Sequence, residues 1–134
     1  MLNPGAVNWL AVLVALIANQ VLGFLWYGPL FGKMWSEATG KTPEEMGTPG
    51  SSIAIAIVCG LVEAIAMALV LTLPSAVDLG TGLALGLLIA IGFVATTGIT
   101  GAVFEGKNRT VLGLGLGYQI AGLAIMGAIL GAWH

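Results

Sequence analysis

The chain has 134 residues, of which 58% are hydrophobic and only 7% charged, and its mean hydropathy is +1.04. An ordinary soluble domain carries about a quarter charged residues, so this composition excludes one. The net charge is −2 and there is no basic tract, so we expect no nucleic-acid partner. The length suits one compact membrane unit, a single domain over residues 1–134 with the lipid bilayer as its surroundings.

Four apolar segments follow one another along the chain, at residues 8–30, 52–73, 82–104 and 110–133. Each reaches the roughly 20 residues that a helix needs to cross a hydrocarbon core of about 30 Å. No ten-residue alternation of polar and apolar residues is present, so helices are favoured over the strands of a membrane barrel. The sequence therefore predicts an all-α integral membrane four-helix bundle.

The first predicted span ends in a dense group of aromatic, glycine and proline residues. Trp26 and Tyr27 suit the headgroup level, Pro29 breaks the helix, and the Lys33 side chain can reach water. Glu105 ends the third span at the same predicted level, where it could pair with Lys33. We call these five residues the inner-rim signature.

The basic residues set the predicted orientation. Lys33 and Lys41 lie in the first connection, Lys107 and Arg109 lie in the third, and the second connection and both termini have none. Basic residues favour the cytoplasmic side, so we expect a multi-pass protein of the cell (inner) membrane with both termini on the extracytoplasmic side. The first connection also contains a helix-start pattern at residues 42–45, which predicts either a short surface helix or a solvated loop.

Polar residues from four different spans fall at about the same depth. Counting about 1.5 Å per residue from the cytoplasmic ends places Asn19, Glu63 and Gln119 near mid-membrane, with Thr97 and Tyr118 close to that level. A carboxyl group at this depth is costly, and no Lys or Arg matches it, so desolvation favours its neutral form. We expect these groups to face one another or a shared cavity.

Three interpretations of this polar layer stay open. In the first, a protonated Glu63 donates to the Asn19 or Gln119 amide and the layer holds the helices together. In the second, Glu63 takes up and releases a proton during transport or permeation of a small molecule or proton. In the third, Glu63 contacts a partner protein, and the chain is a non-catalytic accessory or scaffolding subunit of a larger membrane complex.

Enzymatic chemistry finds little support in the sequence. The only histidine is His134 at the very end, and the only cysteine, Cys59, lies in an apolar run, so no triad or metal site is expected. We expect no enzyme activity, no cofactor and no metal.

The chain contains 21 glycines, and several are spaced four residues apart. This spacing lets membrane helices approach closely, either within one bundle or between subunits. Because a small bundle cannot cover glycine faces on every helix, the sequence favours a homo-oligomer. The pairs are Gly82 with Gly86, Gly113 with Gly117, and Gly127 with Gly131.

Four segments of the chain form a recognisable pattern: Asn8-Trp9-Leu10, Trp26-Tyr27-Gly28-Pro29 with Phe31-Gly32-Lys33 and Trp35, Phe104-Glu105-Gly106, and the terminal segment from Met126 to Trp133. In these segments the chain resembles a bacterial family of small four-span membrane proteins of unknown function. The resemblance implies four helices and no accepted activity. The chain departs from the family pattern at Gly28, where serine is frequent, and at Gln119, where histidine is frequent, and Glu63 matches no shared feature.

Overall fold

A computed structural model describes residues 2–40, 50–106 and 108–133, and every regular element in these ranges is helical. The all-α class predicted from the sequence is therefore confirmed for this part of the chain. The helix-start pattern at residues 42–45 lies outside the described residues. The elements are η1 (Pro4–Ala6), α1 (Trp9–Leu25), η2 (Trp26–Leu30), α2 (Gly32–Thr39), α3 (Gly50–Val70), α4 (Leu79–Ile89), η3 (Ala90–Ala95), α5 (Thr96–Glu105) and α6 (Arg109–Ala132).

Within the described residues, three helices are long and apolar enough to cross a membrane. They are Trp9–Leu30, Leu79–Glu105 and Arg109–Ala132. The apolar part of α3, Ala54–Val70, is shorter. Large apolar side chains such as Phe24, Val103 and Phe104 are 71–87% exposed, which is typical of surfaces that face lipid rather than water.

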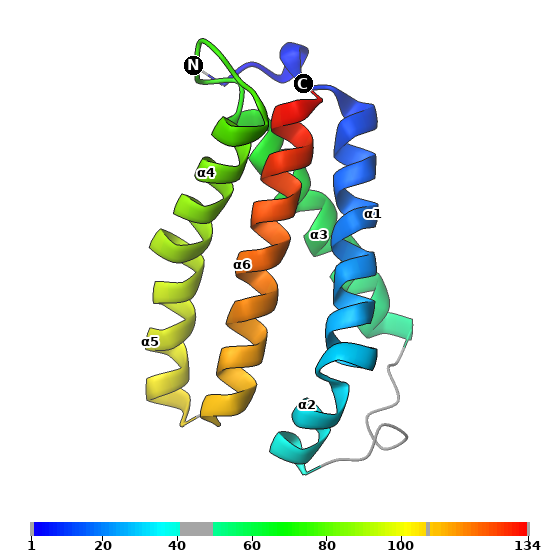
Figure 1. Ribbon diagram of the computed structural model, residues 1–134, viewed down its shortest axis with the longest axis vertical. Coiled ribbons are helices and arrows are strands. Elements are labelled where there is room, and N and C mark those ends of the chain that lie inside the picture. The colour runs from blue at the N-terminus through cyan, green and yellow to red at the C-terminus, as the bar shows by residue number, and fades with distance from the viewer. Residues whose placement is uncertain (1, 41–49, 107, 134) are drawn as a thin grey trace.

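The long helices are packed side by side around α6 (Figure 1). The α4–α5 rod lies against one side of α6, α1 lies against the other, and α3 crosses obliquely behind α1 and α6. Residues 3 to 8, 72 to 78 and 133 gather at one end, which we call the terminal end: the Asn3 amide donates to Thr72 Oγ1 at 3.0 Å. Lys33 and Arg109 lie at the opposite end, the basic end, where Asn108 Nδ2 donates to the Ala38 carbonyl at 3.5 Å.

The helix boundaries follow ordinary capping chemistry. Asn8, Asp78 and Asn108 each accept hydrogen bonds from backbone amides in the first turn of α1, α4 and α6, which satisfies donors that a helix start leaves open. The helices α2 and α5 end at Gly40 and Gly106, whose φ angles are 72° and 71°. Glycine adopts this left-handed conformation without a steric penalty.

The closest packing in the structure joins α4 to α6 through glycines. A methyl group added to Gly82 would meet the Gly127 carbonyl oxygen, and one added to Gly127 would meet the Gly82 carbonyl oxygen. In the same way Gly131 faces the Asp78 carbonyl, and Gly86 faces the Leu123 carbonyl. Two of the three glycine pairs, 82/86 and 127/131, are thus occupied within the chain.

Two long helices contain a short π-helical segment. In η2, Pro29 has no amide hydrogen to continue an α-helical ladder, and the Phe31 amide instead donates five residues back to the Trp26 carbonyl at 2.8 Å. In η3 the widened turn is followed by threonines. Thr97 Oγ1 donates to the Phe93 carbonyl at 2.6 Å and Thr96 Oγ1 donates to the Gly92 carbonyl at 2.9 Å, as threonine hydroxyls within a helix commonly do.

Candidate functional site

Three residues of the predicted polar layer, Asn19, Tyr118 and Glu63, form what we call the polar cluster. Its centre is Asn19 on α1, which is only 6% exposed. Its side chain lies between two glycines from neighbouring helices. A methyl group at Gly122 of α6 would be 2.5 Å from Asn19 Oδ1, and one at Gly60 of α3 would be 3.5 Å from Asn19 Nδ2. Glycine at both positions therefore leaves the space that this amide occupies.

Tyr118 of α6 is the partner of Asn19. Its hydroxyl donates to the Asn19 backbone carbonyl at 3.2 Å. The ring lies over Gly23 of α1, where a methyl group would be 3.0 Å from the hydroxyl oxygen. One buried amide and one tyrosine thus tie α1 to α6 at mid-helix.

Glu63 of α3 lies beside this pair. It is half-buried and interacts electrostatically with Tyr118. It also lines a cavity of about 250 Å³ whose other walls are apolar side chains of α3, α4, η3 and α6: Ala66, Met67, Val70, Ile89, Val94 and Leu123. A single carboxyl group therefore faces a small, otherwise apolar space.

The hydrogen bond from Glu63 to an amide, expected if the layer only holds the helices together, is not seen. Among the described residues no hydrogen bond joins Glu63 to Asn19 or to Gln119. Gln119 is half-buried on α6, one turn from the cavity residue Leu123. At this level, α1 and α6 are instead joined by the hydrogen bond from the Tyr118 hydroxyl to the Asn19 backbone carbonyl.

Thr97 does not join the cluster. It is exposed on α5, and its hydroxyl bonds the Phe93 and Val94 carbonyls of its own helix. Its depth along the helix was compatible with the polar layer, but depth does not determine the direction in which a side chain points. The Thr97 hydroxyl therefore donates hydrogen bonds to backbone carbonyls of η3 and not to the polar cluster.

The inner-rim signature forms a second group at the basic end. Trp26 Nε1 donates to the Leu114 carbonyl at 3.0 Å, and Tyr27 packs edge-on against both Tyr118 and Trp35, with ring centres 5.6 and 5.3 Å apart. Tyr27 thus connects the mid-helix cluster with the basic end. Its hydroxyl also approaches α6, because a methyl group at Gly115 would be 3.8 Å from it.

Lys33 and Glu105 are not brought together. Lys33 lies on α2 and, with Tyr27 and Trp35, lines a cavity of about 390 Å³ that we call the inner-rim cavity. Glu105 is instead the last residue of α5. No ion pair joins these two side chains within the described ranges. Pro29 lies within the π-helical turn η2, where it has no amide hydrogen to donate to an α-helical hydrogen bond.

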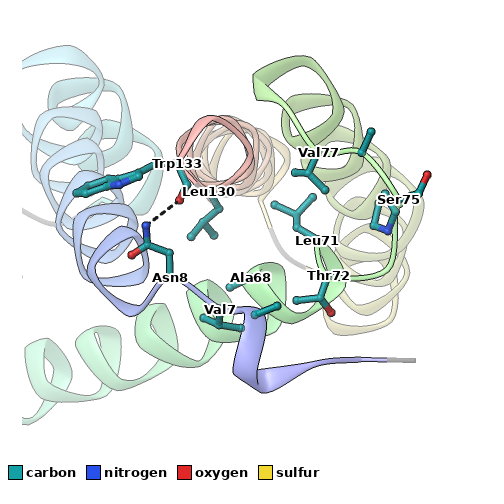
Figure 2. A pocket seen from close by; sticks show the side chains of 12 residues that line it. Val7, Asn8, Ala68, Leu71, Thr72, Ser75, Val77, Leu130 and Trp133 are labelled. Atoms are coloured by element: carbon teal, nitrogen blue, oxygen red, sulfur yellow. Dashed lines mark hydrogen bonds between the residues drawn. The ribbon is translucent and has the colours of Figure 1, made fainter.

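Sequence reasoning missed a cavity of about 450 Å³ at the terminal end (Figure 2). It lies among the N-terminal segment, the end of α3 and the turn that leads to α4, and Val7, Leu71 and Val77 are among its lining residues. Asn8 Nδ2 closes one side by donating to the Trp133 carbonyl at 3.4 Å. Among the described residues, those that line this cavity are all uncharged.

The contact between Gly60 and Gln20 was also not predicted from the sequence. Gly60 brings α3 against α1, since a methyl group there would be 2.7 Å from Gln20 Nε2, and that amide donates to the Ala56 carbonyl at 3.4 Å. The pattern behind this contact is a polar residue on one helix and a small residue on the neighbouring helix. It can be recognised only when it is known which helices are neighbours. In the described part of the chain no three of His, Cys, Asp and Glu gather as metal ligands would.

Comparisons with known proteins give a family but no activity. No curated protein and no solved structure matches the chain. A family model described as "Protein of unknown function (DUF1761)" matches residues 10–131, which is nearly the whole length. The chain belongs to the DUF1761 family of proteins of unknown function.

Proposed function

We propose that this protein is a multi-pass protein of the cell (inner) membrane that moves a proton or a small molecule through its mid-membrane polar cluster. The observation that carries the proposal is the Glu63 carboxyl, which faces an apolar cavity of about 250 Å³ and interacts electrostatically with Tyr118. Ionisable groups at membrane depth are expensive to keep and mark ion or substrate pathways.

A row of side chains leads from this carboxyl toward the basic end. Glu63 interacts electrostatically with Tyr118. The Tyr118 ring packs against Tyr27, and the Tyr27 ring packs against Trp35 beside the inner-rim cavity. Tyrosine hydroxyls both donate and accept hydrogen bonds, so they can pass a proton or guide a polar group. The row supports a pathway that opens at the basic end.

The chemistry of the cavity suggests a class of small molecule. Apolar walls with a single carboxylate complement a small alkylammonium ion, whose carbon atoms would contact the walls while its nitrogen pairs with Glu63. Protonation of Glu63 would release that partner. The transported species in this proposal is therefore a proton, a small amine, or one exchanged for the other.

The test is flux into proteoliposomes, measured with a pH-sensitive dye for protons and with radiolabelled ethylamine for the amine. Glu63→Gln keeps volume and hydrogen bonding but cannot titrate, so both the pH dependence and the amine uptake should disappear. Asp78→Asn is the matched control, because it removes a carboxyl group at the terminal end while the asparagine still caps α4. Flux in Glu63→Gln equal to that of the control would eliminate this mechanism.

A second variant separates the two transported species. Ala66 lines the cavity beside Glu63, so Ala66→Leu narrows the space without touching the carboxyl group. Amine uptake should fall while proton flux remains. If neither changes, the cavity is not on the pathway.

The proposed orientation places the basic end in the cytoplasm, because Lys33 and Arg109 lie there and the terminal end lacks basic residues. Ala38→Cys, in a background with Cys59→Ala, should be shielded from an impermeant thiol reagent in intact cells. Labelling of that cysteine from outside would reverse the orientation.

A second candidate function, an accessory subunit of a membrane complex, draws on the exposed face of α3. Residues 54–59 are all exposed, with Ile55 at 63% and Val58 at 59%, and the glycine pairs 82/86 and 127/131 are already occupied by the contact between α4 and α6. We therefore place contacts with a second copy or another subunit on α3. If α3 faces α3 in a homo-oligomer, oxidative cross-linking through the exposed native Cys59 should give a covalent dimer. Recovery of a different stoichiometric partner in mild detergent would favour the accessory role. A monomer by native mass spectrometry would refute both the homo-oligomer and the accessory role.

A further inference from the structure

We infer that the inner-rim cavity binds the headgroup of a zwitterionic aminophospholipid, of the phosphatidylethanolamine type. The cavity has a volume of about 390 Å³, within the range of about 300–1,000 Å³ that is usual for small-molecule sites. It is formed by the end of η2 and the first turns of α2, and its lining includes both a lysine and a glutamate, Lys33 and Glu37. The proposed pathway through Glu63 does not use these two charges.

The two charges have opposite sign and are not paired with each other. Lys33 and Glu37 are both exposed and lie one helical turn apart, yet no ion pair joins them in the described part of α2. A lone cation would suit any anionic lipid. A cation and an anion facing the same cavity match a ligand that carries both a phosphate and an ammonium group, because each end then has a charged partner.

Two aromatic rings give the ammonium end a further partner. Tyr27 and Trp35 line the cavity, and their rings meet edge-to-face with centres 5.3 Å apart. Aromatic faces attract cations, and tryptophan does so most strongly. The phosphate would then lie toward Lys33, and the ammonium toward Glu37 and the rings.

Glycine makes room for the headgroup. Gly28 lines the cavity, and a methyl group there would have no atom within 4 Å. At Gly32, by contrast, a methyl group would be 2.6 Å from the Tyr27 carbonyl oxygen, so that glycine serves the tight junction between η2 and α2. The free space at Gly28 is therefore part of the cavity and offers a site for a blocking side chain.

The surroundings favour a lipid over a soluble molecule. Leu30 and Met34, which are neighbours of the cavity residues in the chain, are 61% and 49% exposed and can lie along acyl chains. The cavity also follows directly on the helix Trp9–Leu30, which is long enough to cross a membrane, so it lies at headgroup level. This placement rests on the protein spanning the membrane and not on transport through Glu63.

The experiment is native mass spectrometry of the full chain released from nanodiscs that contain equal amounts of phosphatidylethanolamine, phosphatidylcholine and phosphatidylglycerol. We expect retention of phosphatidylethanolamine above the other two, because choline cannot donate hydrogen bonds to Glu37 and glycerol has no cation. Lys33→Gln and Glu37→Gln should each lower that retention about tenfold, the size of one lost charge-assisted hydrogen bond. Gly28→Leu should do the same by filling the space without changing any charge.

Matched controls remove the same charges elsewhere at the basic end. Arg109→Gln and Glu105→Gln lie outside the cavity lining and should leave retention unchanged. Preferred retention of phosphatidylglycerol with Glu37→Gln unchanged would overturn the proposal in favour of a simple anionic-lipid site. Displacement of the lipid by soluble glycerophosphoethanolamine would overturn the lipid assignment in favour of a soluble phosphoamine.

The Glu63→Gln variant separates this inference from the proposed function. It should retain phosphatidylethanolamine as the unaltered protein does, even if its flux is lost. Loss of retention in that variant would show that the two sites are not independent and would refute the assignment of the headgroup to the inner-rim cavity alone. Retention with normal flux would refute the transport mechanism and leave the lipid site standing.

Discussion

The strongest structural prediction concerns Gly127, at the point where α6 touches α4. A methyl group there would collide with the Gly82 carbonyl oxygen and would lie 3.0 Å from the Gly82 carbonyl carbon and 3.4 Å from the Gly86 Cα. All three atoms belong to the facing backbone, so no side chain can turn aside to relieve the clash. We therefore expect Gly127→Ala to force the two helices apart.

The size of the effect follows from two opposing terms. Alanine in place of glycine within a helix stabilises it by up to about 1 kcal/mol. Overpacking of a closely packed contact destabilises by about 1–3 kcal/mol, and a clash with backbone belongs at the upper end of that range. Gly113 is also on α6, and a methyl group there meets nothing within 4 Å. Gly113→Ala should therefore gain the helix stabilisation of alanine without the cost of overpacking.

The measurement is the free energy of unfolding in detergent micelles, by denaturant titration followed by circular dichroism, for both variants. Gly127→Ala should be less stable than Gly113→Ala by about 1–3 kcal/mol. Gly82→Ala, on the facing helix, should behave like Gly127→Ala. Equal stability of Gly127→Ala and Gly113→Ala would mean that α4 and α6 are not in backbone contact, and the packing described above would be wrong.

Three further predictions concern the polar cluster and the terminal end. Tyr118→Phe removes the bond to the Asn19 carbonyl and should lower the unfolding free energy by about 0.5–1.5 kcal/mol; no loss would mean that water replaces the hydroxyl. Gly122→Ala should destabilise because its methyl group would be 2.5 Å from Asn19 Oδ1, and Asn19→Ala should relieve much of that cost in a double-mutant cycle; additive effects would contradict the contact. The Thr81 amide, which donates to the carboxyl at 2.8 Å, holds the pKa of Asp78 below its usual value. Stability from this cap is therefore present at neutral pH and is lost as the pH falls below about 4, and Asp78→Asn should lack that dependence in acid melts monitored by circular dichroism.

The helical class and the three longest apolar helices followed from the sequence because length and composition determine them in lipid. The short helix α2 did not, since Gly32–Thr39 combines glycine, charges and aromatics without an apolar period. Nor did the sequence indicate which glycine pair meets which. Pairs at the same spacing occur at several places, and only the three-dimensional pairing selects 82/86 with 127/131.

The polar cluster shows most clearly what depth along a helix can and cannot predict. Asn19 and Tyr118 meet, whereas Thr97 at a similar level is exposed and bonds its own backbone. Rotation about the helix axis decides between these outcomes, and that rotation is determined by where the small residues allow contact. Gly60 and Gly122 turn α3 and α6 toward the Asn19 amide.

The same packing explains why Glu63 can have a function of its own. A protonated Glu63 that donated to the Asn19 side-chain amide would have been fixed in place by that hydrogen bond. Tyr118 donates to the Asn19 backbone carbonyl, and no hydrogen bond joins Glu63 to Asn19 in the described part of the chain. Glu63 instead lines a small cavity whose other walls are apolar. A carboxyl group that no amide holds, at a depth where it is costly to keep, supports the proposed role in transport.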